Sequence, residues 1–248
     1  MKTPSLVSIA KHRFPYVTRI SSDDLTFINV GFEEDPPMGL PLDVSDEPDR
    51  YFIQLYDRTA TQVDLAGKKV LEVSCGHGGG ASYIMRTVGP ASYTGLDLNA
   101  AGIKFCRRRH RLAGLDFVHG NALNLPFPDK SFDAVLNIQA SFAYSSLPQF
   151  FAEVDRVLRP GGHFLYADRR LRDEIVKWEE ELGDSPMTLT SEKNITEQVA
   201  RGLEKNVSRL NELSRFTPAF LVKRGVARAC RNLRNEQMTY RMYCFGKQ

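Results

Sequence analysis

The 248-residue sequence lacks several features that would place it in a special class of protein. It has no apolar run long enough to cross a bilayer and no compact apolar signal-peptide core, so we expect a cytoplasmic protein. Its 33 basic residues exceed its 30 acidic residues only slightly, which argues against a nucleic-acid partner. The local basic run Arg107–Arg111 is more simply a solvated helix face. A transient contact with the inner face of a membrane stays open.

Patterns typical of metal sites and disulfide frameworks are also missing. Cys75, Cys106, Cys230 and Cys244 form no CxxC pair, and the five histidines form no HExxH motif. We therefore expect no required metal and no disulfide framework. The 42% hydrophobic content suffices for a sizeable core, which favours one soluble α/β domain with additions.

The most informative segment is residues 70–80, VLEVSCGHGGG. It reads as a short apolar strand and a glycine turn, followed by a helix that begins near Ala81. A second strand ends at Asp97, about 20 residues beyond the turn, where a carboxylate commonly accepts hydrogen bonds from ribose hydroxyls. The pattern is typical of a nucleotide-binding βαβ unit.

The acidic residue before the turn narrows the range of possible ligands. The series Gly76-x-Gly78-x-x-Ala81 would also satisfy an NAD fingerprint, so an NAD-dependent oxidoreductase is one alternative. Glu72 disfavours it, because a pyrophosphate site should present backbone N–H groups and a helix N-terminus to negative charge. A carboxylate at this position favours a cationic ligand.

The spacing Glu72-x-Ser74-x-Gly76-x-Gly78 resembles the first motif of class I S-adenosylmethionine-dependent methyltransferases, with Ser74 in place of the usual glycine. The resemblance implies a Rossmann-like α/β fold with a largely parallel seven-stranded sheet, helices on both faces and a helical lid. In such enzymes the acid helps to fix the loop and the amino acid end of the cofactor. By this resemblance S-adenosylmethionine, which leaves as S-adenosylhomocysteine, is held by Glu72, Ser74, Cys75, Gly76, Gly78, Gly79, Asp97, Leu98, Asn121, Ala122 and Gln139.

Further motifs follow in the order of the same family. Residues 115–122 resemble its third strand and adenine-contacting loop, with Asn121 in place of the more usual Asp. Residues 125–138 resemble its turn and fourth strand, and residues 158–168 its turn and fifth strand. We expect residues 1–66 to form an N-terminal extension and lid, 67–168 the cofactor-binding core, and 169–248 a helical lid insertion followed by a final strand at 238–245.

The chain also resembles a narrower group, the phthiotriolone/phenolphthiotriolone dimycocerosate O-methyltransferases. This resemblance rests on residues 33–38, 42–48, 56–61, 71–83, 91–99 and 239–243, several of which lie outside the general motifs. It implies methyl transfer to a hydroxyl of a large hydrophobic acceptor, a lipid or polyketide-derived lipid. Another small hydrophobic or glycosylated natural product is an alternative acceptor.

One segment departs from that group. Relatives typically carry a Glu-Ala-Ser-His-like sequence after the fourth strand, whereas this chain has Gln139-Ala-Ser-Phe142. A histidine there could deprotonate an alcohol, which Phe142 cannot do. Asp168, expected at the end of the fifth strand, is the best remaining base, ahead of Tyr144 and His163. The sequence slightly favours the alternative that Asp168 caps the next helix. A cofactor-binding protein without turnover therefore stays an alternative.

Overall fold

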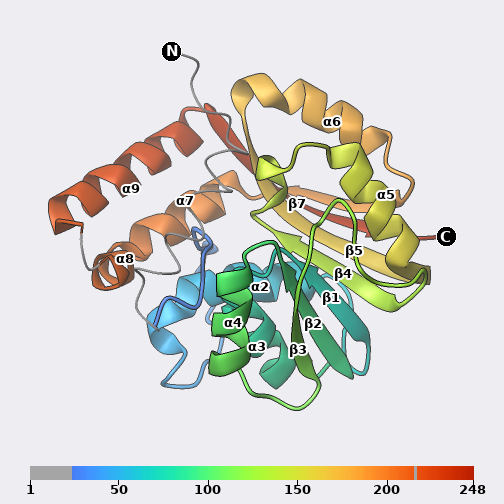
Figure 1. Cartoon of the computed structure of the whole chain (residues 1–248). Helices are drawn as coiled ribbons and strands as arrows, with labels where there is room; N and C mark the ends of the chain where they lie inside the picture. Colours follow the sequence, from blue (N-terminus) through green and yellow to red (C-terminus); the bar gives the residue numbers. More distant parts are fainter. Residues whose placement is uncertain (1–23, 215–216) are drawn as a thin grey trace.

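The computed structural model describes residues 24–214 and 217–248, and the first 23 residues of the expected N-terminal extension lie outside the described part. A central sheet runs through the molecule and carries helices on both faces (Figure 1). Its strand order is β3-β2-β1-β4-β5-β7-β6. The strands are β1 (Lys69–Val73), β2 (Ser92–Asp97), β3 (Leu115–His119), β4 (Phe132–Ile138), β5 (Leu158–Leu171), β6 (Thr188–Asn194) and β7 (Met238–Gly246).

Strands β1 to β5 pair in parallel, and β7 runs antiparallel to both of its neighbours. This arrangement confirms the expected seven-stranded, largely parallel sheet. The longer helices are α2 (Arg50–Ala60), α3 (Gly79–Thr87), α4 (Ala100–Arg109), α5 (Leu147–Val157), α6 (Ile175–Gly183), α7 (Thr196–Lys205), α8 (Val207–Leu213) and α9 (Ala219–Arg234). Single 3-10 turns span Glu47–Asp49, Ser141–Ala143 and Arg172–Glu174.

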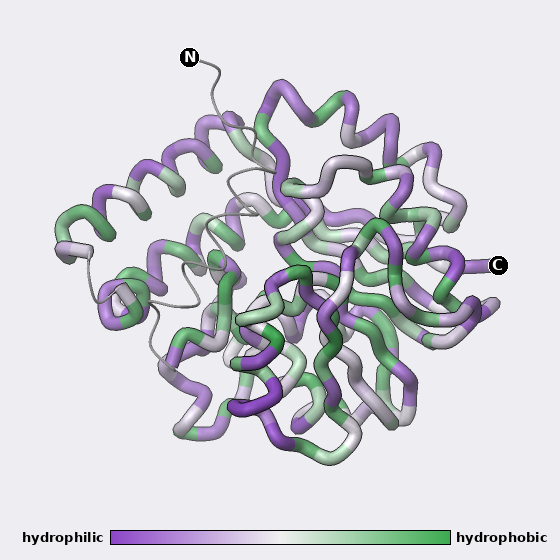
Figure 2. Tube along the Cα trace, viewed as in Figure 1, coloured by the Kyte–Doolittle hydropathy of each residue, from purple (hydrophilic) through white to green (hydrophobic). Residues whose placement is uncertain are grey.

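Two hydrophobic cores lie on opposite faces of the sheet. In β1, Val70 packs into the core beneath α2, α3 and α7, whereas its neighbour Leu71 packs into the core beneath α5 and α6. Both are fully buried, because a parallel sheet is covered on both faces. Hydrophobic residues therefore follow one another along the central strands (Figure 2). This double burial explains the near-continuous apolar runs in the sequence.

Two expectations about the second half of the chain are wrong. Residues 169–235 are not helical throughout, because they include strand β6, whose residues are mostly exposed and polar. Its backbone pairs with β7 at the edge of the sheet, so it needs no apolar alternation. Strand β5 continues to Leu171, which places Asp168 inside the strand and not at its end.

Candidate functional site

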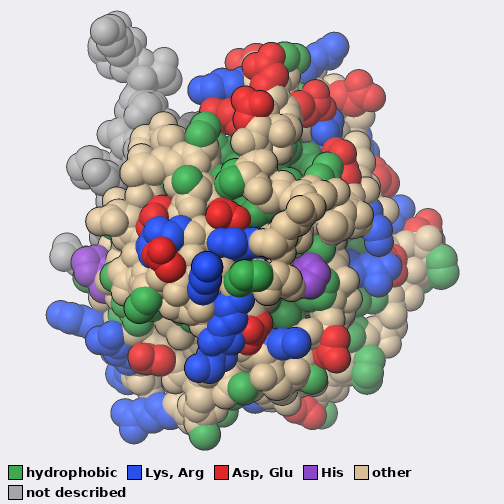
Figure 3. Space-filling model, turned by 90° about the vertical axis from the view of Figure 1, so that its right-hand side faces the viewer, with side chains coloured by type: hydrophobic (Ala, Val, Ile, Leu, Met, Phe, Trp, Pro, Cys, Tyr) green, Lys and Arg blue, Asp and Glu red, His purple; other side chains and the backbone are tan. Residues whose placement is uncertain are grey.

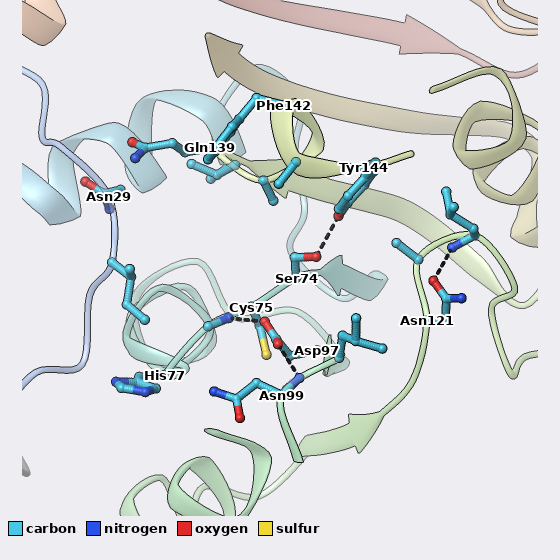
Figure 4. A pocket seen from close by; sticks show the side chains of 18 of the residues that line it. Asn29, Ser74, Cys75, His77, Asp97, Asn99, Asn121, Gln139, Phe142 and Tyr144 are labelled. Atoms are coloured by element: carbon cyan, nitrogen blue, oxygen red, sulfur yellow. Dashed lines mark hydrogen bonds between the residues drawn. The ribbon is translucent and has the colours of Figure 1, made fainter. Parts of the chain in front are cut away.

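A cavity of about 430 Å³ opens at the carboxyl ends of β1, β2 and β4 (Figure 4). Parallel strands of an α/β sheet commonly form their ligand crevice at this edge. The cavity brings together most of the residues expected to hold the cofactor, namely Ser74, Cys75, Gly76, Asp97, Leu98, Asn121, Ala122 and Gln139. Glu72, Gly78 and Gly79 are not among its lining residues.

Asp97 joins the end of β2 to the turn after β1. One of its carboxylate oxygens accepts a hydrogen bond from the Gly76 N–H at 2.9 Å, and the other accepts from the Asn99 N–H at 2.8 Å. Burial raises the pKa of Asp97, and the backbone N–H groups oppose that shift. A carboxylate offers about four acceptor sites, so Asp97 retains capacity for ligand hydroxyls. Its position fits the expected ribose contact.

Ser74 adopts a left-handed backbone conformation, with φ of 65°. This conformation favours glycine, which explains why the family usually has glycine at this position. The Ser74 hydroxyl lies 2.6 Å from the Tyr144 hydroxyl, which also accepts a hydrogen bond from Asn137 Nδ2 at 2.9 Å (Figure 4). Burial raises the pKa of Tyr144, so it stays a neutral phenol. The two hydroxyls tie the turn after β1 to the segment after β4.

Gln139 follows β4 and also has a positive φ, 52°. Its side-chain oxygen accepts hydrogen bonds from the Val30 N–H at 3.0 Å and from the Tyr240 hydroxyl at 3.2 Å. Gln139 thereby connects the N-terminal segment and β7 to the wall of the cavity. The N-terminal segment itself contributes Ile28 and Asn29 to that wall.

Glu72 lies behind the turn and is fully buried. Its two oxygens accept hydrogen bonds from Tyr56 at 2.8 Å and from Tyr93 at 2.9 Å. Burial raises the pKa of Glu72 to about 7, and the two phenols only partly oppose that effect. The carboxyl group therefore braces α2 against the strands that carry the turn.

The glycines at the start of α3 serve packing against other parts of the chain. Gly78 has φ of 76°, and a Cβ at this position would lie 2.8 Å from the Phe117 ring. The Gly79 N–H donates to the carbonyl of Thr26 at 3.1 Å. A segment of the protein therefore occupies this helix N-terminus, where a dinucleotide site would present its N–H groups to pyrophosphate.

Asp168 is fully buried and does not line the cavity. One of its oxygens accepts hydrogen bonds from the Ser141 hydroxyl at 2.6 Å and the Phe142 N–H at 2.9 Å, and lies 3.3 Å from the Arg170 guanidinium. These contacts position the turn that carries Phe142. Of the two weaker candidates for the base, Tyr144 lines the cavity and His163 does not.

Phe142 forms part of the cavity wall, a position that the sequence did not predict for it. The Phe142 ring lines the cavity, and the Arg169 guanidinium carbon lies 3.9 Å from its centre. Arg169 is half-buried, and no carboxylate of the described residues lies within ion-pair distance of it. Successive side chains of β5 point to opposite faces of the sheet, so Arg169 lies on the other face from Arg170, which forms an ion pair with Asp168. The sequence places two arginines in succession but does not reveal this difference.

Comparison with known proteins gives one clear family. Residues 71–166 match the family model described as a methyltransferase domain. A fatty-acid O-methyltransferase from Mycolicibacterium smegmatis is 56% identical over 241 residues, covering 94% of this chain and 88% of the relative. A phthiotriol/phenolphthiotriol dimycocerosates methyltransferase from Mycobacterium tuberculosis is 53% identical, covering 99% of this chain and 94% of the relative.

Solved structures with low sequence identity share the fold. The [4+2]-cyclase SpnF matches with a TM-score of 0.75 at 19% identity, covering 100% of this chain and 98% of that one. Geranyl diphosphate C-methyltransferase from Streptomyces coelicolor matches with a TM-score of 0.71 at 16% identity, covering 100% of both chains. The sheet order, the Asp97 site and the close relatives agree, and the chain belongs to the class I S-adenosylmethionine-dependent methyltransferases.

Proposed function

We propose that this protein transfers the methyl group of S-adenosylmethionine to an oxygen atom of a long-chain lipid acceptor. The observation that carries the proposal is one cavity with two chemically different ends. Asp97 and Asn121 supply polar groups at one end, and Ile28 and Phe142 supply apolar walls elsewhere. The names of the two relatives, which specify a fatty acid and phthiotriol dimycocerosates, support a lipid acceptor.

At the polar end, the chain offers complementary groups for the cofactor. Asp97 would accept hydrogen bonds from the ribose hydroxyls, and Leu98 and Ala122 would supply apolar contacts. Asn121 Oδ1 already accepts from the Leu123 N–H at 3.0 Å, which leaves its amide N–H groups to donate to adenine. The turn at Ser74 and the Gln139 segment would enclose the methionine part. When bound, S-adenosylmethionine supplies an electrophilic methyl group on a sulfonium.

No group lining the described part of the cavity is well suited to deprotonate an alcohol. Burial raises the pKa of Tyr56 and Tyr144, and a hydrogen bond with Cys106, followed by burial, raises the pKa of Cys75, so each holds its proton. His77 lies far from Phe142 in Figure 4, and both oxygens of Asp97 accept backbone hydrogen bonds. Transfer to an alcohol would therefore depend on positioning and water exclusion.

A carboxylate acceptor is a second candidate, and Arg169 specifically favours it. A carboxylic acid is ionised at neutral pH, so its methylation forms an O–CH₃ bond without removal of a proton. A half-buried guanidinium is also stabilised by an anionic partner, which Arg169 lacks among the described residues. The product would be a methyl ester, whereas an alcohol would give a methyl ether.

The test combines cofactor binding with an acceptor screen. We expect saturable calorimetric binding of S-adenosylmethionine and S-adenosylhomocysteine, weakened roughly 10- to 100-fold by Asp97→Asn, because hydrogen bonds to a charged group are lost. The exposed Asp43→Asn should bind normally. The wild type should then transfer labelled methyl groups to long-chain acids or hydroxylated lipids. Absence of cofactor binding, or binding without transfer to either acceptor class, would overturn the proposal.

A further inference from the structure

Helix α9 buries only one side. Val226 and Cys230 point into a small core that also includes Leu203 of α7, and Leu233 packs into the larger core beneath α2, α3 and α7. Their spacing of three to four residues defines a single stripe along the helix. The opposite side of α9 faces outward from the molecule, beside α7 and α8 (Figure 1).

The outward side combines two kinds of residue. Phe220 and Leu221, in the first turn, are 66% and 46% exposed. Arg224, Arg228 and Arg231 follow at spacings of four and three residues, which places them on the same side of the helix as the two apolar residues. Figure 2 shows hydrophobic residues at the N-terminal end of α9 and mostly hydrophilic residues further along the helix.

The positive charge of this surface is not neutralised within the described part of the chain. Helix α9 contains no acidic residue. Arg234 forms ion pairs with Glu197 and Glu204, but no ion pair within the described residues involves the three arginines of the outward side. Elsewhere the surface differs, since Figure 3 shows acidic side chains gathered at the top of the molecule, where α6 lies, among basic ones.

We propose that α9 docks this protein on the surface of a bilayer that contains anionic phospholipids. Phe220 and Leu221 enter the interface between headgroups and acyl chains, and Arg224, Arg228 and Arg231 contact lipid phosphates. An amphipathic helix with apolar anchors and a basic polar surface has this preference. The long arginine side chains can also lay their apolar stems along the interface. A nucleic acid would use the arginines but would gain little from the two exposed apolar residues.

The docking surface connects to the cavity through a short path. Val30 packs against the core that α9 shares with α7, and its N–H donates to Gln139. The preceding residues, Ile28 and Asn29, line the cavity. A chain of contacts from the buried side of α9 therefore leads to this wall of the cavity.

The test measures how much of the full chain sediments with vesicles in the absence of a methyl-transfer reaction. One set of vesicles contains phosphatidylcholine alone, and the other contains added phosphatidylglycerol. We expect binding only to the anionic vesicles, reduced by added salt. Binding should fall roughly tenfold or more in Phe220→Ser/Leu221→Ser and in Arg224→Gln/Arg228→Gln/Arg231→Gln. Matched controls at exposed positions are Val176→Ser and Lys104→Gln/Arg109→Gln/Arg111→Gln, which should bind normally.

Thermal melting and calorimetry with S-adenosylmethionine check that every variant is folded. Absence of binding to anionic vesicles would overturn the proposal, and so would equal binding by the α9 variants and the controls. Binding of duplex DNA that requires the three arginines but not Phe220 or Leu221, in place of vesicle binding, would assign this surface to nucleic acid. None of these results depends on methyl transfer, so failure here leaves the proposed function intact.

Discussion

The guanidinium carbon of Arg169 lies 3.9 Å from the centre of the Phe142 ring, and that ring lines the cavity. The close contact places a cation beside Phe142, the position at which the resemblance to the narrower group led us to expect a histidine. A histidine can remove a proton from an alcohol, whereas an arginine attracts an anion and keeps its own proton. Arg169 itself is not among the residues that line the cavity, and its contact with Phe142 is what favours a carboxylate as the second candidate acceptor.

Arg169→Met should separate the two acceptor classes. Because the variant removes the cation and keeps an unbranched apolar side chain, we expect kcat/KM for a long-chain fatty acid to fall roughly 10- to 100-fold. Transfer to a hydroxylated lipid should change little. Labelled methyl transfer to both acceptors measures the difference, and the exposed Arg172→Met is the control. An equal effect on both acceptors would show that Arg169 has no role in recognising an anion.

Ser74 should be more sensitive to alanine than to glycine. Both substitutions remove the hydrogen bond with Tyr144, but alanine retains a Cβ at φ of 65°. We expect Ser74→Ala to be less stable than Ser74→Gly by about 1 kcal/mol in the free energy of unfolding, measured with urea. Tyr144→Phe removes the same hydrogen bond without changing the turn. Equal stability of the two Ser74 variants would mean that the left-handed conformation costs nothing there.

The sequence predicted that Asp97 and Ser74 lie together in the structure, but it did not predict the surroundings of Phe142, for a physical reason. Asp97 and the turn at Ser74 depend on local spacing along one βαβ unit, so their positions follow from the chain itself. Phe142, Arg169 and Ile28 meet only after the N-terminal segment, β4 and β5 have packed together. Long-range packing of this kind leaves no periodic signal in the sequence.

Secondary structure shows the same division. The buried parallel strands could be predicted, because burial on both faces requires apolar runs. The edge strand β6 could not, since its residues are mostly exposed and its pairing with β7 uses backbone groups. Glu72 is an intermediate case. Its negative charge indicated the kind of ligand from the sequence alone. Its two tyrosine partners could not be predicted, because they come from separate elements, α2 and β2.

Asp168→Asn should destabilise the fold without removing a catalytic base. The variant leaves the buried Arg170 without its counter-charge, so we expect the free energy of unfolding to fall by about 3 kcal/mol. Measured well below the melting temperature, kcat should change by no more than about threefold, with an unchanged pH profile, because Asp168 does not line the cavity. Arg170→Met should show a similar loss of stability. A large fall in kcat at unchanged stability would instead identify Asp168 as the base.

Glu72 should make stability depend on pH. Burial raises its pKa from 4.5 to about 7, so the folded protein binds this proton more tightly than the unfolded chain does. The resulting stabilisation is complete below pH 4.5 and is lost as the pH rises through 7. We therefore expect the neutral Glu72→Gln variant to gain up to about 3 kcal/mol relative to the wild type between pH 5 and 8.

Urea unfolding of the wild type and Glu72→Gln across that range tests this prediction. The quantity to compare is the difference in the free energy of unfolding between the two proteins at each pH. Burial lowers the pKa of His77 and His110, so these histidines change the stability with pH in the opposite direction to Glu72. Those effects are common to both proteins and cancel. The exposed Glu180→Gln should follow the wild type at every pH. Parallel curves for the wild type and Glu72→Gln would mean that Glu72 is ionised throughout, and that its two tyrosine hydrogen bonds fully offset the cost of burying the charge.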